Sequence, residues 1–351
     1  MPEPESTPAP VSAPSDQETG RPVALLVLAA LATLWLAATL WAAYRTMASA
    51  MDGTSIAVAQ AAIALPSIVG ASVLAGTGAG LVALATLARR GRAGRGVPDL
   101  ARPVSRALAG AAGGLCVGLL SALAVLLAYG SGRFIVAIAA TVGLAAVGGG
   151  ALCVLRPALA VAAGLAGSLT AVLVGLVRSA LAGRLSALIN AGDTAASQLS
   201  ADNTVQFVVS ALSGLAAGLV AFWYLRRTRT GAPWPAYLIA GGSAGAVLLV
   251  TELLVRIGGA RLLTVAQSTS PADRAVLEYL GSQRFNHALM VLFVGAFVAV
   301  VAFGRTLPPR RGGLPPPPGE PPPREPPPRE PPPGGEPRPS GEPRPSGAQT
   351  S

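Results

Sequence analysis

Long apolar runs separated by short polar or arginine-containing breaks are the dominant pattern of this chain. A transmembrane helix needs about 20 predominantly apolar residues to cross the hydrocarbon core of a bilayer, and eight runs approach or exceed that length. The pattern therefore predicts an all-α, polytopic integral membrane protein with about eight transmembrane helices. The predicted spans cover residues 23–43, 67–88, 107–128, 134–155, 158–177, 204–225, 235–255 and 287–303.

The transmembrane bundle, residues 23–305, lies between two segments that contain few large apolar residues. Residues 1–22 are rich in Pro, Glu and Ser, and residues 306–351 consist almost entirely of Pro, Gly, Arg, Glu and Ser. Such compositions do not bury enough apolar surface to offset the entropy lost on ordering, so both tails are predicted to be disordered. The C-terminal repeats, such as Glu320-Pro-Pro-Pro-Arg324, favour an extended polyproline II conformation.

Three segments do not fit a simple series of spans. As one helix, residues 56–88 would reach about 50 Å, against a hydrocarbon core of about 30 Å. Because proline removes a backbone donor, Pro66 predicts an interfacial or re-entrant segment over 56–65, which carries Gln60. An amphipathic surface helix is predicted within 178–203, with Asp202 or Asn203 capping the sixth span. The loop 256–286 is predicted to hold a short surface helix that starts at Pro271.

The arginines predict the orientation of the bundle. Cytoplasmic loops of membrane proteins carry an excess of basic residues, and the loop after the second span is the most basic one between spans. With this loop inside and eight spans, both termini are cytoplasmic in the plasma membrane, and the loop contacts anionic lipids of that leaflet. Only the outer loop 256–286 is discordant, because it carries four arginines of its own. The arginines that anchor the inner loop are Arg89, Arg90, Arg92, Arg95, Arg102 and Arg106.

Composition supports a membrane protein and argues against several classes of function. Hydrophobic residues make up 52% of the chain and charged residues 12%, whereas soluble domains average about 25% charged. The net charge of +10 is explained by membrane sidedness, so no nucleic-acid partner is predicted. All 26 basic residues are arginines, and the chain has a single histidine and two cysteines, Cys116 and Cys153. This inventory predicts no metal site, cofactor or disulfide.

Three polar residues near or within the spans are candidates for function. Glu252 is the only acidic residue predicted inside a span, and intramembrane carboxylates often couple transport to protons or cations. An i,i+4 pair with Arg256 is the alternative role for it. Gln60 and Ser243 are the other two candidates.

Ser243 lies in a Gly-x-Ser-x-Gly pattern, which a serine hydrolase would pair with a histidine. The predicted topology places His287 at the outer end of the eighth span, far from Ser243. We therefore interpret Gly241 to Gly245 as small residues that let helices pack closely, and we predict no catalytic residue.

A short internal match raises the possibility of a repeat. Gly80-Leu-Val-Ala83 and Gly218-Leu-Val-Ala221 occupy the same place in the second and sixth spans, just before their basic ends. A duplicated four-span unit would explain the match, and it would require correspondence in the other spans as well.

The sequence favours a non-enzymatic scaffold or accessory subunit, because polar groups in the spans are few and the Pro-rich C-terminal tail offers a docking segment for a protein partner. The alternative is a permease for an apolar or lipid-like solute. A cavity at the middle of the membrane lined by Gln60, Ser243 and Glu252 would favour the permease, and a bundle without a cavity would favour the scaffold. An intramembrane hydrolase would require His287 to lie beside Ser243.

Orientation is testable by cysteine labelling. In a variant with Cys116 and Cys153 replaced by alanine, a cysteine at Ala93 should react with a membrane-impermeant maleimide only after the cells are permeabilised, because its loop is predicted to be cytoplasmic. A cysteine at Val265, in the predicted outer loop, is the control and should react on intact cells. Labelling of position 93 from outside would overturn the predicted orientation.

Overall fold

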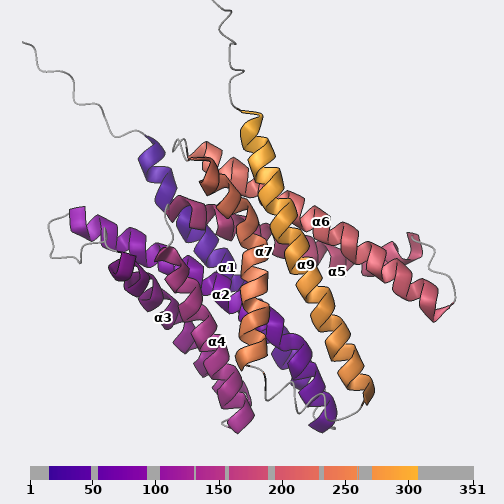
Figure 1. Ribbon diagram of the computed structural model, residues 1–351. Helices are drawn as coiled ribbons and strands as arrows, with labels where there is room; N and C mark the ends of the chain where they lie inside the picture. The colour runs from indigo at the N-terminus through magenta and orange to yellow at the C-terminus, as the bar shows by residue number, and fades with distance from the viewer. Residues whose placement is uncertain are drawn as a thin grey trace, which may run out of the picture. The chain divides into compact units, whose positions relative to one another are not determined.

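The computed structural model describes residues 16–48, 54–92, 103–129, 132–154, 158–188, 194–228, 233–258, 260 and 271–306. Apart from a 3-10 turn at Leu152–Val154, these residues form eight long α-helices and no strand (Figure 1). The helices are α1 (Asp16–Ala48), α2 (Thr54–Arg92), α3 (Pro103–Tyr129), α4 (Arg133–Ala151), α5 (Ala158–Leu188), α6 (Ala195–Arg227), α7 (Trp234–Gly258) and α9 (Pro271–Gly304).

Each of these eight helices contains a stretch that is long and apolar enough to cross a membrane. The prediction of an all-α, polytopic membrane protein with about eight spans is therefore confirmed. Helix α2 is the most enclosed, with 72% of its apolar window buried, against 22% for α3. Large side chains of α3 such as Leu120 and Leu127 are exposed, as expected for a face that contacts lipid.

The expected break at Pro66 is wrong, because α2 continues through this residue from Thr54 to Arg92. Leu65 and Val69, on either side of Pro66, are buried in a cluster that includes Val255 of α7. A proline removes only one backbone hydrogen bond from a helix, and packing by neighbouring helices lets transmembrane helices tolerate it. Gln60 thus belongs to α2 and not to a re-entrant segment; its side chain lies outside the described residues.

The two predicted surface helices are the ends of longer helices. Helix α5 runs to Leu188, and α6 begins at Ala195 after its N-cap Thr194, whose hydroxyl accepts a hydrogen bond from the Ser197 N–H at 3.2 Å. Helix α9 starts at Pro271 as expected but continues without a break to Gly304. The caps predicted at Asp202 or Asn203 are therefore wrong. Polar residues interrupt the apolar pattern at these places without ending the helices.

The two tails are described only in part. Helix α1 begins at Asp16, so residues 16–22 are helical and not part of a disordered tail as predicted. Residues 1–15 and 307–351, which include the Pro-rich repeats, lie outside the described residues. The same is true of Arg95 and Arg102, whereas Arg89 and Arg90 are exposed at the end of α2.

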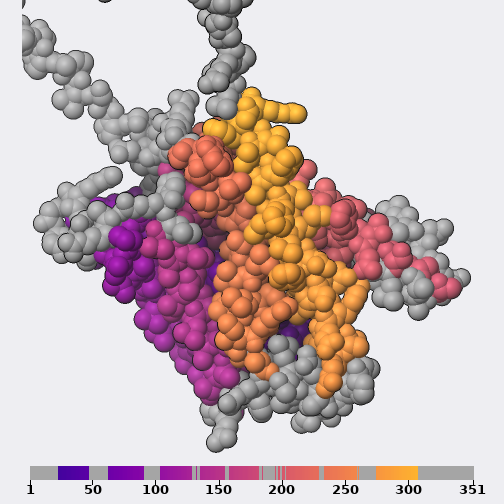
Figure 2. Space-filling model, in the orientation of Figure 1, coloured from indigo at the N-terminus to yellow at the C-terminus, as the bar shows by residue number. Residues whose placement is uncertain are grey.

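The chain folds as two successive four-helix units with similar internal packing, although α5 also packs against α7 and the first half has no comparable contact between α1 and α3. In the first half, α2 packs against α1, α3 and α4, and α3 packs against α4. In the second half, α6 packs against α5, α7 and α9, and α7 packs against α9. Helices α7 and α9 lie side by side on the face shown in Figure 2.

Glycines at equivalent positions make the closest helix contacts in both halves. Gly80 of α2 lies against Gly110 of α3 and Gly150 of α4, and the last two are also in contact with each other. In the second half, Gly295 of α9 lies against both Gly218 of α6 and Gly241 of α7.

The next helical turn repeats the correspondence. Gly76 contacts Ala146 as Gly214 contacts Val291, and Gly114 contacts Val147 as Gly245 contacts Leu292. The spacing of these residues along each helix is the same in both halves. Correspondence in three pairs of helices supports the duplication that the sequence indicated only in the second and sixth spans.

The glycine contacts predict a position-specific effect on stability. A Cβ at Gly150 would collide with backbone atoms of Gly110 and Gly114, whereas a Cβ at Gly148 would meet no atom within 4 Å. Gly150→Ala should therefore lower the free energy of unfolding by about 1–3 kcal/mol, while Gly148→Ala should leave it unchanged or raise it slightly. Thermal unfolding in detergent measures both, and equal melting temperatures would contradict the proposed packing.

Candidate functional site

A half-open cavity of about 430 Å³ lies where the two halves of the bundle meet. Helices α1 and α2 of the first half and α5, α6, α7 and α9 of the second half line it. Its volume is within the range of about 300–1,000 Å³ that is usual for small-molecule sites. Its lining residues lie between about one third and the middle of the length of α2, α6 and α9.

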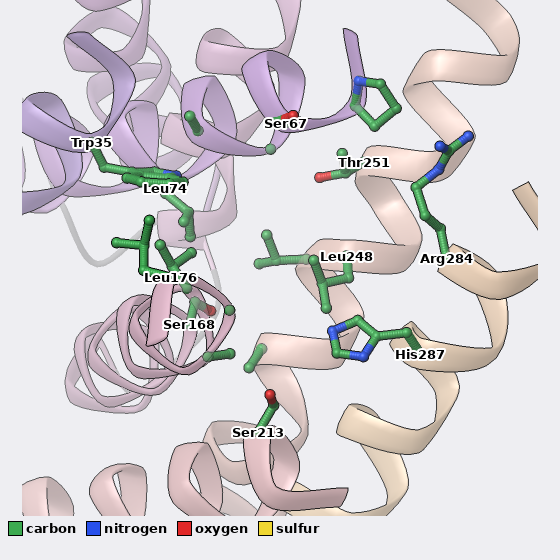
Figure 3. Close-up of a pocket in the computed structure, with 18 of the residues that line it drawn as sticks. Trp35, Ser67, Leu74, Ser168, Leu176, Ser213, Leu248, Thr251, Arg284 and His287 are labelled. Carbon is green, nitrogen blue, oxygen red and sulfur yellow. The ribbon is translucent and has the colours of Figure 1, made fainter. Parts of the chain in front are cut away.

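The walls of the cavity differ in chemistry. Figure 3 shows Trp35, Leu74 and Leu176 on one side and Thr251, Arg284 and His287 on the other. Thr251 is seven residues, or about 10 Å, from the end of α7. The cavity is therefore an apolar chamber with a polar wall below the end of the bundle.

Two buried hydroxyl groups in the cavity wall have no hydrogen-bond partner among the described residues, namely Ser213 Oγ and Thr251 Oγ1. Other buried hydroxyls donate to a carbonyl of the preceding turn, as Ser72 does to Ile68 and Ser168 does to Gly164. Leaving a buried polar group unpaired costs about 1–3 kcal/mol. The two orphaned hydroxyls therefore mark places where a ligand or water would be bound.

Glu252 lies behind the polar wall and is held by two arginines. Its side chain is 8% exposed, and its two carboxylate oxygens accept from Arg256 Nε at 3.3 Å and from Arg284 Nε at 3.2 Å. The i,i+4 pair with Arg256 is the alternative role that the sequence predicted for Glu252. The pair with Arg284 links α7 to α9, and this arginine also lines the cavity.

His287 also lines the cavity and connects α9 to α6 through Ser210, with 2.6 Å between Nδ1 and Oγ. The Ser210 hydroxyl donates to the Gln206 carbonyl at 2.6 Å. Because a hydroxyl has one proton, we assign the Nδ1–H as the donor to Ser210. In this arrangement the imidazole does not act as a base toward Ser210.

The Ser243 hydroxyl instead donates to the Ala240 carbonyl at 2.7 Å, and Ser243 packs against Gly164 of α5. Ser243 and His287 thus have different partners, and the contact that a hydrolase would require is not among those described. Close packing at Gly241 and Gly245 agrees with the interpretation of this segment as a helix contact.

The structure separates two of the three predicted candidates from the cavity. Ser243 and Glu252 are absent from its lining, and nothing is described of the Gln60 side chain. Sequence reasoning missed Arg284 and considered His287 only as a partner for Ser243, because it placed both at or beyond the edge of the eighth span. Their spacing of three residues, which puts them on one helix face, was the available signal.

The remaining chemistry is sparse. Cys116 and Cys153 are free, and Cys153 is buried with its thiol 3.8 Å from the Thr77 carbonyl oxygen. Among the described residues, no group of three His, Cys, Asp or Glu side chains is arranged to hold a metal ion. No protein-family model, no curated protein and no solved structure matches the chain.

Glu252 pairs with two arginines that differ in exposure, so substitutions in this group should have unequal effects on stability. Glu252→Gln would leave Arg284 without its counter-charge in a mostly buried position, so it should destabilise the protein by about 3–5 kcal/mol. Arg256 is 58% exposed, so Arg256→Gln should cost far less.

A double variant makes this prediction sharper. Glu252→Gln combined with Arg284→Gln should be more stable than Glu252→Gln alone, because it removes the uncompensated charge. Thermal melting of the purified variants measures the cycle. Additive losses from the two substitutions would contradict direct pairing.

Proposed function

We propose that this chain is a membrane permease for a lipid-like solute. The observation that carries the proposal is the cavity between the two halves, which combines an apolar wall with two buried, unpartnered hydroxyl groups. Buried polar groups are normally hydrogen-bonded to protein or to ordered water. In a binding site, the ligand supplies the missing partner.

The internal duplication supports transport over a scaffold role. Many transporters consist of structural repeats with the solute site near the middle of the membrane at the junction of the repeats. Here four-helix units repeat with parallel orientation, since each contains an even number of spans, and the cavity lies at their junction. The two halves are therefore the units that would move relative to each other during alternating access.

The scaffold favoured from the sequence rested on the small number of polar groups expected within the spans. Arg284, His287 and Thr251 now add polar groups inside one cavity. Docking of a protein through the Pro-rich C-terminal tail stays a prediction, as does proton coupling through Glu252. If coupling exists, transport by folded Glu252→Gln protein should no longer depend on a proton gradient.

Location and orientation complete the proposal. We infer that the protein resides in the plasma membrane with both termini in the cytoplasm. Arg89 and Arg90 end α2, and Arg226 and Arg227 end its counterpart α6 at the same side of the bundle. Two basic helix ends on one side support contact with anionic lipids of the cytoplasmic leaflet.

Blocking the cavity is the direct test of the proposed function. Gly175 lines the cavity, and a Cβ there would meet no atom within 4 Å, so Gly175→Phe would place a bulky side chain at the cavity wall without a backbone collision at its Cβ. Gly148→Phe is the matched control, because Gly148 is equally open but does not line the cavity.

The protein is reconstituted in phosphatidylcholine vesicles that contain trace fluorescent phosphatidic acid, phosphatidylglycerol or fatty acid, each labelled on its acyl chain. In vesicles with the wild type or Gly148→Phe, labelled lipid should move from the inner to the outer leaflet, where external dithionite bleaches the label. Gly175→Phe should lower the rate of this movement at least about ten-fold. The proposal would be refuted if each of the three probes moved between the leaflets at the same rate in vesicles with and without the protein.

A further inference from the structure

The cavity has an excess of positive charge. Arg178 of α5 and Arg284 of α9 both line it. The described contacts give Arg284 one counter-charge, Glu252, which is shared with Arg256, and they give Arg178 no ion pair. Two arginines therefore line one cavity, and the nearby carboxylate of Glu252 is shared between Arg284 and Arg256.

An uncompensated cation is costly in the interior of a membrane protein. A bound anion would reduce that cost, and guanidinium groups match the planar oxygen pairs of carboxylate and phosphate groups. Ser213 and Thr251 add two hydroxyl donors that have no partner among the described residues. The positive charge of the cavity and its free hydroxyl donors therefore both favour binding of an anionic group.

The rest of the cavity wall favours an apolar part of the ligand. Trp35, Leu74 and Leu176 form the wall that faces Thr251 and His287 across the cavity (Figure 3). A small free anion would leave this apolar wall in contact with water. An anionic headgroup attached to a hydrocarbon tail would satisfy both walls at once.

Comparison of the two halves indicates that the glycine contacts do not require Arg284 and His287. Arg284 and His287 precede Gly295 by 11 and eight residues, and the equivalent residues before Gly150 in α4 are Ala139 and Val142. The first half keeps the same glycine contacts with apolar residues at these places. The polar side chains are thus a feature of the second half alone.

We propose that the solute of the cavity is an anionic amphiphile, with a carboxylate or phosphate monoester headgroup held by Arg178, Arg284 and the hydroxyls of Ser213 and Thr251, and with its tail along Trp35, Leu74 and Leu176. This inference rests on the proposed permease function and names the class of its solute. His287 is the part of the polar wall that lies between Arg284 and α6.

Trp35 provides a direct reporter of the tail. In a variant that keeps Trp35 and carries phenylalanine at the other three tryptophans, Trp41, Trp223 and Trp234, dibrominated stearate should quench the fluorescence of the purified full-length protein with saturation. The methyl ester of the same acid has the same tail without the charge and should bind at least about ten-fold more weakly. Inorganic phosphate should neither quench nor displace the stearate.

Substitutions then test the headgroup site. Arg284→Gln and Arg178→Gln should each weaken stearate binding about ten-fold or more, the loss expected when a charge-assisted hydrogen bond is removed. Arg256→Gln is the matched control, because Arg256 also pairs with Glu252 but does not line the cavity. Unchanged binding of the methyl ester to each variant shows that its cavity is intact.

The outcomes separate the two proposals. Equal affinity for the acid and its ester, with no effect of Arg284→Gln and Arg178→Gln, would overturn the anionic solute and leave a permease for neutral lipid-like molecules. Anion-selective binding without movement of any label in the vesicle experiment would uphold the headgroup site and overturn the permease. Displacement of bound stearate by hexadecyl phosphate or by palmitate at lower concentration identifies phosphate or carboxylate as the preferred headgroup. Displacement by inorganic phosphate alone would overturn the amphiphile.

Discussion

Close approach of helix backbones at glycine is the constraint on which this structure depends. Inside a bilayer, apolar side chains gain little by moving from lipid to protein, so helices associate through tight packing and polar contacts. Gly80, Gly110 and Gly150 bring α2, α3 and α4 together, and Gly218, Gly241 and Gly295 do the same for α6, α7 and α9. Each set leaves no space for a Cβ atom at its contacts. Three helices of each half are thereby fixed as one unit, and the junction between the units is where space remains for a cavity.

The polar groups at that junction are organised around an ion pair that crosses between helices. Glu252 of α7 holds Arg284 of α9, and this contact places a guanidinium group in the cavity wall. The Ser210–His287 contact fixes α9 against α6 a turn further along. These contacts satisfy part of the polar wall and leave Ser213, Thr251 and Arg178 for a ligand. The paired groups thus fix the positions of the helices around the cavity, and the unpaired groups are available to bind a ligand.

Much of the fold followed from the sequence, because a run of about 20 apolar residues has few alternatives to a spanning helix. Helix ends were harder to predict, since packing against neighbours carries α2 through Pro66 and carries α9 from Pro271 through its polar first turns. The duplication appeared in the sequence only as Gly80–Ala83 and Gly218–Ala221, because most glycine contacts pair residues on different helices. The cavity was not predictable for the same reason: Arg284 meets Glu252 across 32 residues, and His287 meets Ser210 across 77.

The central claim is that the cavity at the junction of the halves holds an anionic amphiphile. An experimental structure of the protein, extracted directly into nanodiscs with its native lipids, tests that claim most directly. The account predicts elongated density along Trp35 and Leu74 that ends in a headgroup within hydrogen-bonding distance of Arg284 or Arg178. A cavity that is closed by protein side chains, or that contains only water beside Ser213 and Thr251, would contradict it.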